Sequence, residues 1–183
     1  MNIFVDGQDF LNFLKRLNTV LGKQQGSSLR IRPLPTGAFT ILSYCLMPNH
    51  FHLLIRQNTE LSAAKLISKV CTSYSMYFNK KYSHIGGVFQ DQYKAVPIDN
   101  DAYLLWVSAY IHQNPVVGGL VESLADYPWS SYLDYVGKRH GKLPEPNFLI
   151  AMAGSLGLYE KFVEDSFAKI KTRKDIEHLL LDA

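Results

Sequence analysis

Two apolar runs, separated by a proline and an asparagine, constrain most strongly how this chain can fold. Residues 39–47 and 50–55 are rich in β-branched, aromatic and other apolar side chains, and Pro48-Asn49 interrupts them. Runs of this kind around a short break predict two strands joined by a tight turn. We therefore expect a β-hairpin over residues 39–55.

Helices are predicted before and after the hairpin. Acidic residues at Asp6 and Asp9 precede apolar positions spaced three and four apart up to Leu21, the pattern of an amphipathic helix with an acidic cap. A second apolar stripe runs from Ala63 to Phe78 and leaves Lys65 and Lys69 off it. The exposed face of this second helix should be mildly basic.

The second half of the chain is predicted to continue with a strand and more helices. Apolar residues between 88 and 98 indicate another strand. The cluster at residues 99–101 is a good helix N-cap, and Pro115 predicts that the helix from Ala102 ends near Asn114. The last part, 158–181, is predicted to form one or two amphipathic helices.

This order of elements predicts an α+β fold in which helices pack against an antiparallel sheet. The 183 residues suit one compact unit, and 47% hydrophobic content is ample for its core. Two cysteines and no long apolar run favour a reduced, cytoplasmic protein without a membrane span. A net charge of +3 permits a polyanionic partner without requiring one.

His50 and His52 are the first candidates for chemistry. Side chains alternate along a strand, so both imidazoles should project from one face while Phe51 points to the other. Two nitrogen ligands for a metal would then converge. The ordinary alternative is that these histidines only pack or form hydrogen bonds on the sheet.

A helix-borne tyrosine is the second candidate. Tyr110 and Asn114 are four residues apart and share a helical face, so a hydroxyl and an amide could meet a metal-held phosphate. A core role is the alternative for Tyr110, because Tyr103 and Trp106 are near it. Spacing alone does not choose between Asn114 and His112 as a further ligand.

Four blocks carry a resemblance to a known family. They are Leu46-Met47-Pro48-Asn49-His50-Phe51-His52-Leu53-Leu54, Gly87-Val88-Phe89-Gln90, Tyr110-Ile111-His112-Gln113-Asn114-Pro115-Val116, and Tyr127-Pro128-Trp129-Ser130-Ser131-Tyr132. In this order they closely resemble the REP-associated tyrosine transposases, which belong to the single-tyrosine HUH transposases. The resemblance covers roughly residues 2–135 and is far more specific than any single motif.

The resemblance implies a ferredoxin-like antiparallel sheet with helices packed on it, the HUH endonuclease fold, over residues 1–137. Residues 138–183 would be a helical extension of the same unit. It also implies Mg²⁺ or Mn²⁺ on His50, His52 and Asn114, with Tyr110 as the nucleophile. The activity would be cleavage and transfer of single-stranded DNA through a covalent 5′-phosphotyrosine.

The implied substrates are hairpin-forming repeats or the ends of a mobile element, bound by a monomer or homodimer. We expect Arg56, Lys65, Lys69 and Lys94 to contribute to DNA binding. The match departs from the family in two places. A strand that usually precedes the segment resembling Asn2-Ile3-Phe4 is missing, and Gln92 stands where an arginine is common.

Three explanations of the missing strand are open. Met1 is not the original start, another segment or subunit takes the place of the strand, or the protein is a decayed relative of the family. Two alternative functions follow from the same residues. One is a non-catalytic binder of structured single-stranded nucleic acid. The other is a metalloenzyme of unrelated chemistry built on the histidine pair.

Overall fold

The computed structural model describes residues 1–23, 31–90 and 92–172. Contacts divide the chain into two compact units, and each unit draws on several stretches of sequence. The first comprises residues 1–40, 48–50 and 55–93, and the second comprises residues 41–47, 51–54 and those from 94 onward. A domain boundary at residue 137 stays a prediction.

The α+β class is confirmed. The elements are α1 (Gly7–Val20), β1 (Phe39–Leu46), β2 (Phe51–Gln57), α2 (Ala63–Tyr82), α3 (Asp101–Val117), a 3₁₀ turn (Leu124–Asp126), α4 (Tyr132–Tyr135), α5 (Asn147–Ala153) and α6 (Leu156–Thr172). The predicted hairpin is present as the sheet β1-β2, which is the only sheet in the described residues. Within that part of the chain, no helix is both long and apolar enough to cross a membrane.

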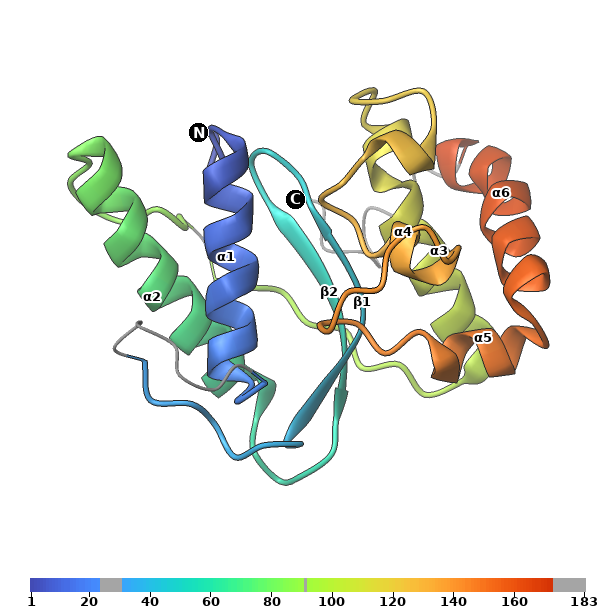
Figure 1. The fold of residues 1–183 in the computed structure, drawn as a ribbon, viewed down its shortest axis with the longest axis horizontal. Coiled ribbons are helices and arrows are strands. Elements are labelled where there is room, and N and C mark those ends of the chain that lie inside the picture. Colours follow the sequence, from blue (N-terminus) through green and yellow to red (C-terminus); the bar gives the residue numbers. More distant parts are fainter. Residues whose placement is uncertain (24–30, 91, 173–183) are drawn as a thin grey trace. The chain divides into compact units, whose positions relative to one another are not determined.

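Helix α1 begins where the acidic cap was predicted. The Asp6 side chain accepts a hydrogen bond from the backbone N–H of Asp9 at 3.2 Å, and the Asp9 side chain accepts one from the N–H of Asp6 at 3.2 Å. This reciprocal capping box satisfies N–H groups that the first helical turn leaves without partners. Helix α1 then packs against α2, and the two lie side by side in Figure 1.

Aromatic rings form the core of the first unit. The rings of Phe4, Phe13 and Tyr74 contact one another, each pair at a centroid distance of 5.4 Å. The Tyr74 hydroxyl donates a hydrogen bond to the carbonyl of Ile3, so its polar end is satisfied inside this apolar cluster. The stretch before α1 is thereby held against α2.

In the second unit, the backbone of strand β1 forms hydrogen bonds with segments that are not strands. The carbonyls of Leu42 and Leu46 accept hydrogen bonds from the hydroxyls of Tyr135 and Tyr127, both at 2.6 Å. The N–H of Leu46 also donates to the carbonyl of Trp129, within an isolated bridge between Cys45 and Ser130. Residues 127–135 thus supply polar partners that a further strand would otherwise provide.

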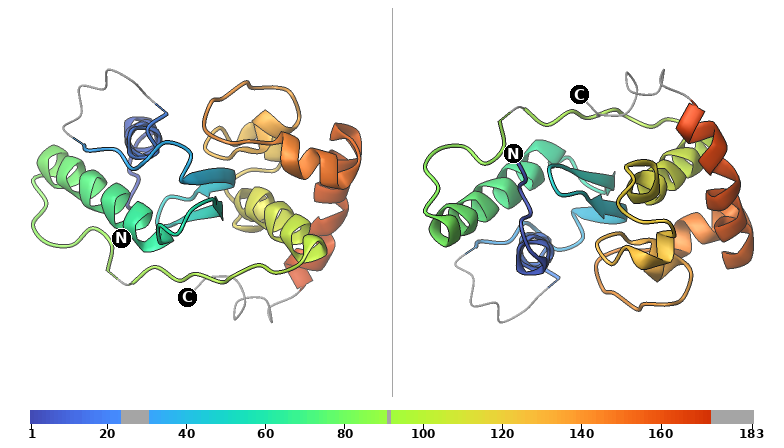
Figure 2. Two further views of the ribbon diagram at one scale, coloured as in Figure 1. Left: turned by 90° about the horizontal axis from the view of Figure 1, so that it is seen from below. Right: turned by 90° about the horizontal axis from the view of Figure 1, so that it is seen from above.

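Helix α3 extends further than its sequence predicts. It runs through Pro115 to Val117, so the predicted end near Asn114 is wrong. Pro115 has no N–H to donate to the carbonyl four residues earlier, so one hydrogen bond of the helix is lost. The helix nevertheless continues for part of a turn, and the N–H of Gly118 donates to the backbone carbonyl of Asn114 at 2.8 Å. Burial of Val107 to Pro115 stabilises the helix past the proline, and Figure 2 shows α6 lying along α3.

The strand predicted within residues 88–98 is also wrong. Residues 92–98 form neither helix nor strand, and Tyr93 and Val96 are exposed. An extended apolar segment becomes a strand only when its backbone pairs with another, and Pro97 has no N–H to contribute. The cluster that follows does cap a helix, because the Asn100 side chain accepts from the N–H of Tyr103 at 2.8 Å.

Candidate active site

His50 and His52 lie at the start of β2. His52 is buried within the strand, in the second unit. His50 precedes the strand by one residue and is half-buried, and its Nδ1 lies 2.8 Å from the side-chain oxygen of Asn49. The convergence of the two rings on one ligand remains the prediction from strand alternation.

Tyr110 lies directly beside His52. Both belong to the second unit, and their ring centroids are 5.8 Å apart with the planes at 82°, an edge-to-face contact. Tyr110 is 8% exposed and His52 5% exposed, so both side chains are largely shielded from water. Strand β2 and helix α3 therefore bring together residues that are distant in the sequence.

Asn114 follows one turn later on α3 and has an unusual environment. Its side chain is buried, and among the described residues its Nδ2 has no hydrogen-bond partner. A buried amide in this condition costs about 1–3 kcal/mol unless another group satisfies it. Because an amide can turn to present its oxygen, this side chain suits a bound group that needs an oxygen donor.

His112 is occupied elsewhere. It is fully buried, with Nε2 2.8 Å from the Ser131 hydroxyl and Nδ1 3.1 Å from the Tyr159 hydroxyl. Burial, and then the charge of Arg139, lower the pKa of His112 to about 3. A neutral ring with both nitrogens engaged by hydroxyls ties α3 to α6 and to the segment before α4.

The described residues contain no group of three or more histidine, cysteine, aspartate or glutamate side chains that could hold a metal ion. With the described residues alone, a metal beside Tyr110 would take an amide oxygen, a water or a substrate oxygen in addition to imidazole nitrogens. Such a mixed nitrogen and oxygen set fits Mn²⁺ well and fits Mg²⁺ when a phosphate completes it.

The four basic residues predicted to bind DNA are divided between the units. Arg56, Lys65 and Lys69 belong to the first unit and Lys94 to the second. The Arg56 Nε donates to the side chain of Asn58 at 3.1 Å, and the Lys69 ammonium donates to the carbonyl of Arg32 at 3.1 Å. Arg56, Lys65 and Lys94 are exposed and Lys69 is half-buried.

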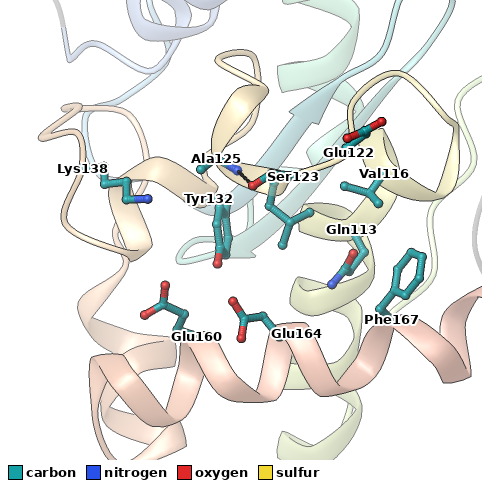
Figure 3. A pocket seen from close by; sticks show the side chains of 11 residues that line it. Gln113, Val116, Glu122, Ser123, Ala125, Tyr132, Lys138, Glu160, Glu164 and Phe167 are labelled. Atoms are coloured by element: carbon teal, nitrogen blue, oxygen red, sulfur yellow. Dashed lines mark hydrogen bonds between the residues drawn. The ribbon is translucent and has the colours of Figure 1, made fainter.

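A hollow in the second unit lies at a different place (Figure 3). Its lining includes Gln113, Tyr132, Glu160, Glu164 and Phe167, and none of the predicted site residues. In Figure 3 the Tyr132 hydroxyl points toward the two carboxylates, and burial followed by these charges raises the pKa of Tyr132 to about 12. Carboxylates repel phosphate, so this hollow does not suit a DNA strand.

In the sequence, Trp106 is only a neighbour that favours a core role for Tyr110. The structure stacks the Trp106 ring on Tyr110, with centroids 5.9 Å apart and planes at 23°. Tyr103 is stacked with Trp106 in turn, with centroids 6.3 Å apart. The three aromatic residues are spaced three and then four positions apart, and this spacing in the sequence indicates that their rings share one face of the helix.

Part of the chain is similar in sequence to known transposases. Residues 34–114 match the family model described as "Transposase IS200 like". The chain is also 27% identical over 106 residues to the "Putative REP-associated tyrosine transposase" of Haemophilus influenzae, a match that covers 51% of this chain and 59% of that protein. No solved structure matches the chain significantly. His50, His52, Tyr110 and Asn114 all fall within the matched range, so the segment that carries the candidate site is similar to the IS200-like transposases.

Proposed function

We propose that the chain cleaves and rejoins single-stranded DNA, with Tyr110 as the nucleophile and a divalent cation beside it. The edge-to-face contact between Tyr110 and His52 carries this proposal. It brings a nucleophilic hydroxyl next to a histidine, a residue type that binds metals, within a segment that is similar to the IS200-like transposases. The substrates would be hairpin-forming repeats or mobile-element ends.

In the proposed reaction, the Tyr110 oxygen attacks a backbone phosphorus and the bond from phosphorus to the 3′ oxygen breaks. The phenol gives up its proton, and the departing 3′ oxygen takes one to become a free hydroxyl. The product is a 5′-phosphotyrosine, which is still a phosphodiester. Because the number of phosphodiester bonds is unchanged, a 3′-hydroxyl can reverse the step and join strands without ATP.

His50, His52 and Asn114 would hold Mg²⁺ or Mn²⁺. Such an ion supplies positive charge that stabilises the charge developing on the phosphate oxygens. The unpartnered amide of Asn114 supports its assignment as the third ligand, and the two hydroxyls on His112 argue against that histidine. The chain's own contribution is to orient Tyr110 and to limit water around it.

A non-catalytic binder of structured nucleic acid is the second candidate. One observation favours it: the described residues lack a cluster of three strong metal-ligating side chains. The same observation weighs against a metalloenzyme of unrelated chemistry. A binder would form no covalent adduct with DNA, so the two candidates differ in one measurable product.

The test uses the Tyr110→Phe variant. Incubation of the unaltered protein with single-stranded hairpin oligonucleotides and Mn²⁺ should give a protein–DNA adduct on a denaturing gel. Tyr110→Phe should lose the adduct completely while keeping affinity for DNA, because only one oxygen is removed and the ring contacts with His52 and Trp106 remain. Tyr132→Phe, which changes a tyrosine of the same unit outside the proposed site, is the matched control and should still form the adduct.

The nuclease proposal would be abandoned if Tyr110→Phe still formed the adduct. It would equally be abandoned if the unaltered protein bound hairpins but never formed one. In that second case the binding function would take its place.

A further inference from the structure

A row of three aromatic rings runs along one face of α3. Tyr103, Trp106 and Tyr110 are spaced three and four residues apart, so they share a helical face that continues to Asn114. The Tyr103 and Trp106 planes differ by 6°, and the Trp106 and Tyr110 planes by 23°. Nearly parallel rings of this kind have the geometry of a stack that another flat ring can extend.

Exposure changes along this row. Tyr110 is buried with the rest of Val107 to Pro115, whereas Tyr103 and Trp106 are only half-buried. The row therefore leads from the interior around Tyr110 toward solvent. Aromatic surface that is partly open to water, and continuous with a candidate nucleophile, is accessible to a substrate.

Unsatisfied polar atoms occur near both ends of the row. Within the described part of the chain, the Tyr103 hydroxyl and the Asn114 Nδ2 are buried without a hydrogen-bond partner. Buried polar groups nearly always have partners. The Asn114 amide lies at the end of the row that is assigned to the metal, and the Tyr103 hydroxyl lies at the other end, where a polar group of a bound strand would satisfy it. A nucleotide offers a flat ring that can stack on the aromatic side chains and polar groups that can form hydrogen bonds.

We propose that Trp106, backed by Tyr103, stacks the base of the nucleotide next to the phosphate that Tyr110 attacks. This inference rests on the proposed function, because it takes the position of the phosphate from Tyr110. The four-residue spacing places Trp106 about 6 Å from Tyr110 along the helix axis. The stack thus holds the strand beside the nucleophile without reading its sequence, because every base has a flat face.

The chain offers a direct readout, because Trp106 and Trp129 are its two tryptophans. The Trp129 contact with β1 uses its backbone carbonyl, so Trp129→Phe keeps it and leaves Trp106 as the single indole. Adding Tyr110→Phe stops cleavage and isolates binding. Oligo(dT) should then quench the fluorescence of Trp106, whereas an abasic oligonucleotide of equal length, with all its phosphates, should not.

Affinity supplies a second readout. Trp106→Leu should weaken binding of oligo(dT) roughly 5- to 150-fold, the usual loss for one base–aromatic stack, and should leave binding of the abasic probe unchanged. Trp106→Phe keeps a ring and should retain most of the affinity, which guards against a folding defect. Phe148→Leu, which changes an exposed aromatic of α5 in the same unit, is the control and should have no effect.

The outcomes separate the two proposals. If oligo(dT) binds with unchanged Trp106 fluorescence, or if Trp106→Leu binds it as tightly as Phe148→Leu does, the stacking inference is overturned, while adduct formation still decides the nuclease proposal. If quenching and affinity loss occur but no adduct ever forms on hairpins, the stack stands and the nuclease proposal falls. If neither probe binds, the stacking inference is overturned, and adduct formation on hairpins still decides the nuclease proposal.

Discussion

The carboxylate of Asp9 makes the first unit sensitive to the loss of a single charge. Its side chain is fully buried, and donors converge on both oxygens. Oδ1 accepts from the Tyr77 hydroxyl at 2.9 Å and the Lys81 ammonium at 2.8 Å. Oδ2 accepts from the N–H groups of Val5 and Asp6 and from the Tyr82 hydroxyl.

Asp9→Asn keeps the shape but converts one acceptor oxygen into an NH₂ donor. If the amide oxygen replaces Oδ2, the capping box survives while Lys81 and Tyr77 lose their acceptor. A charged hydrogen bond contributes about 1.5–3 kcal/mol and a neutral one about 1 kcal/mol. Tyr77 can rotate its hydroxyl to accept from the new amide, so the expected loss of unfolding free energy is about 2–4 kcal/mol.

Urea denaturation followed by circular dichroism measures this loss. Asp6→Asn is the matched control, because Asp6 also pairs with Lys81, at 2.7 Å, but its side chain is 51% exposed. Water screens an exposed pair, and asparagine is itself a good N-cap, so this variant should unfold near the urea concentration of the unaltered protein.

The effect should depend on pH. Burial opposes ionisation of Asp9, but the hydrogen bonds from Lys81, the Val5 N–H and the tyrosines outweigh it, so its pKa is lowered. A lowered folded-state pKa stabilises the protein above the unfolded-state value, about 3.9, and that stability is lost as pH falls through the folded-state pKa. The difference between the unaltered protein and Asp9→Asn should therefore shrink below about pH 4. A difference that stayed constant from pH 7 to pH 3, or an Asp9→Asn variant as stable as Asp6→Asn, would refute this reasoning.

Three further predictions concern the second unit and the DNA. Chelation of the metal by EDTA should abolish Mn²⁺-dependent adduct formation, and so should His52→Ala. The control variant His84→Ala should still form the adduct. Cleavage that persists in EDTA would contradict a role for the metal. A plot of the logarithm of the affinity for single-stranded DNA against the logarithm of the salt concentration should have a slope of roughly −0.7 per phosphate contacted. The double variant Lys65→Gln, Lys94→Gln should make this slope shallower. An unchanged slope would show that these lysines do not contact phosphate. Because His112 is buried with a pKa of about 3, protonation of the unfolded chain should cost the unaltered protein about 1.4 kcal/mol of stability per pH unit below about pH 6.5. His112→Gln should remove that dependence, whereas substitution of the exposed His140 should not, and parallel pH profiles for all three proteins would contradict the assignment.

Local patterns in the sequence predicted the hairpin and the starts of the helices. The hairpin follows from apolar runs around Pro48-Asn49, and α1 and α3 begin at the predicted caps Asp6 and Asn100. These features depend on side chains within a few residues of one another. Short-range sterics and hydrogen bonding therefore suffice to specify them.

Elements that depend on distant partners were not predictable in the same way. The stretch between residues 88 and 98 has strand-like composition, but its described residues, 88–90 and 92–98, form no strand. Composition does not reveal whether a pairing edge exists. The partners of β1 in residues 127–135 likewise had no strand pattern, since side-chain hydroxyls and one loop supply the hydrogen bonds. Pro115 within α3 is tolerated because burial of the surrounding turns stabilises the helix.

By itself the sequence determined the residue types of the candidate site, because the motif containing His50 and His52 and the spacing of Tyr110 and Asn114 are local properties. Only the tertiary structure decided which of them meet. It set Tyr110 against His52, engaged both nitrogens of His112 with Ser131 and Tyr159, and left the amide of Asn114 without a partner. These outcomes depend on how α3 packs against β2, α6 and the segment before α4, and the contacts between such distant segments are set by packing of the whole unit rather than by local periodicity.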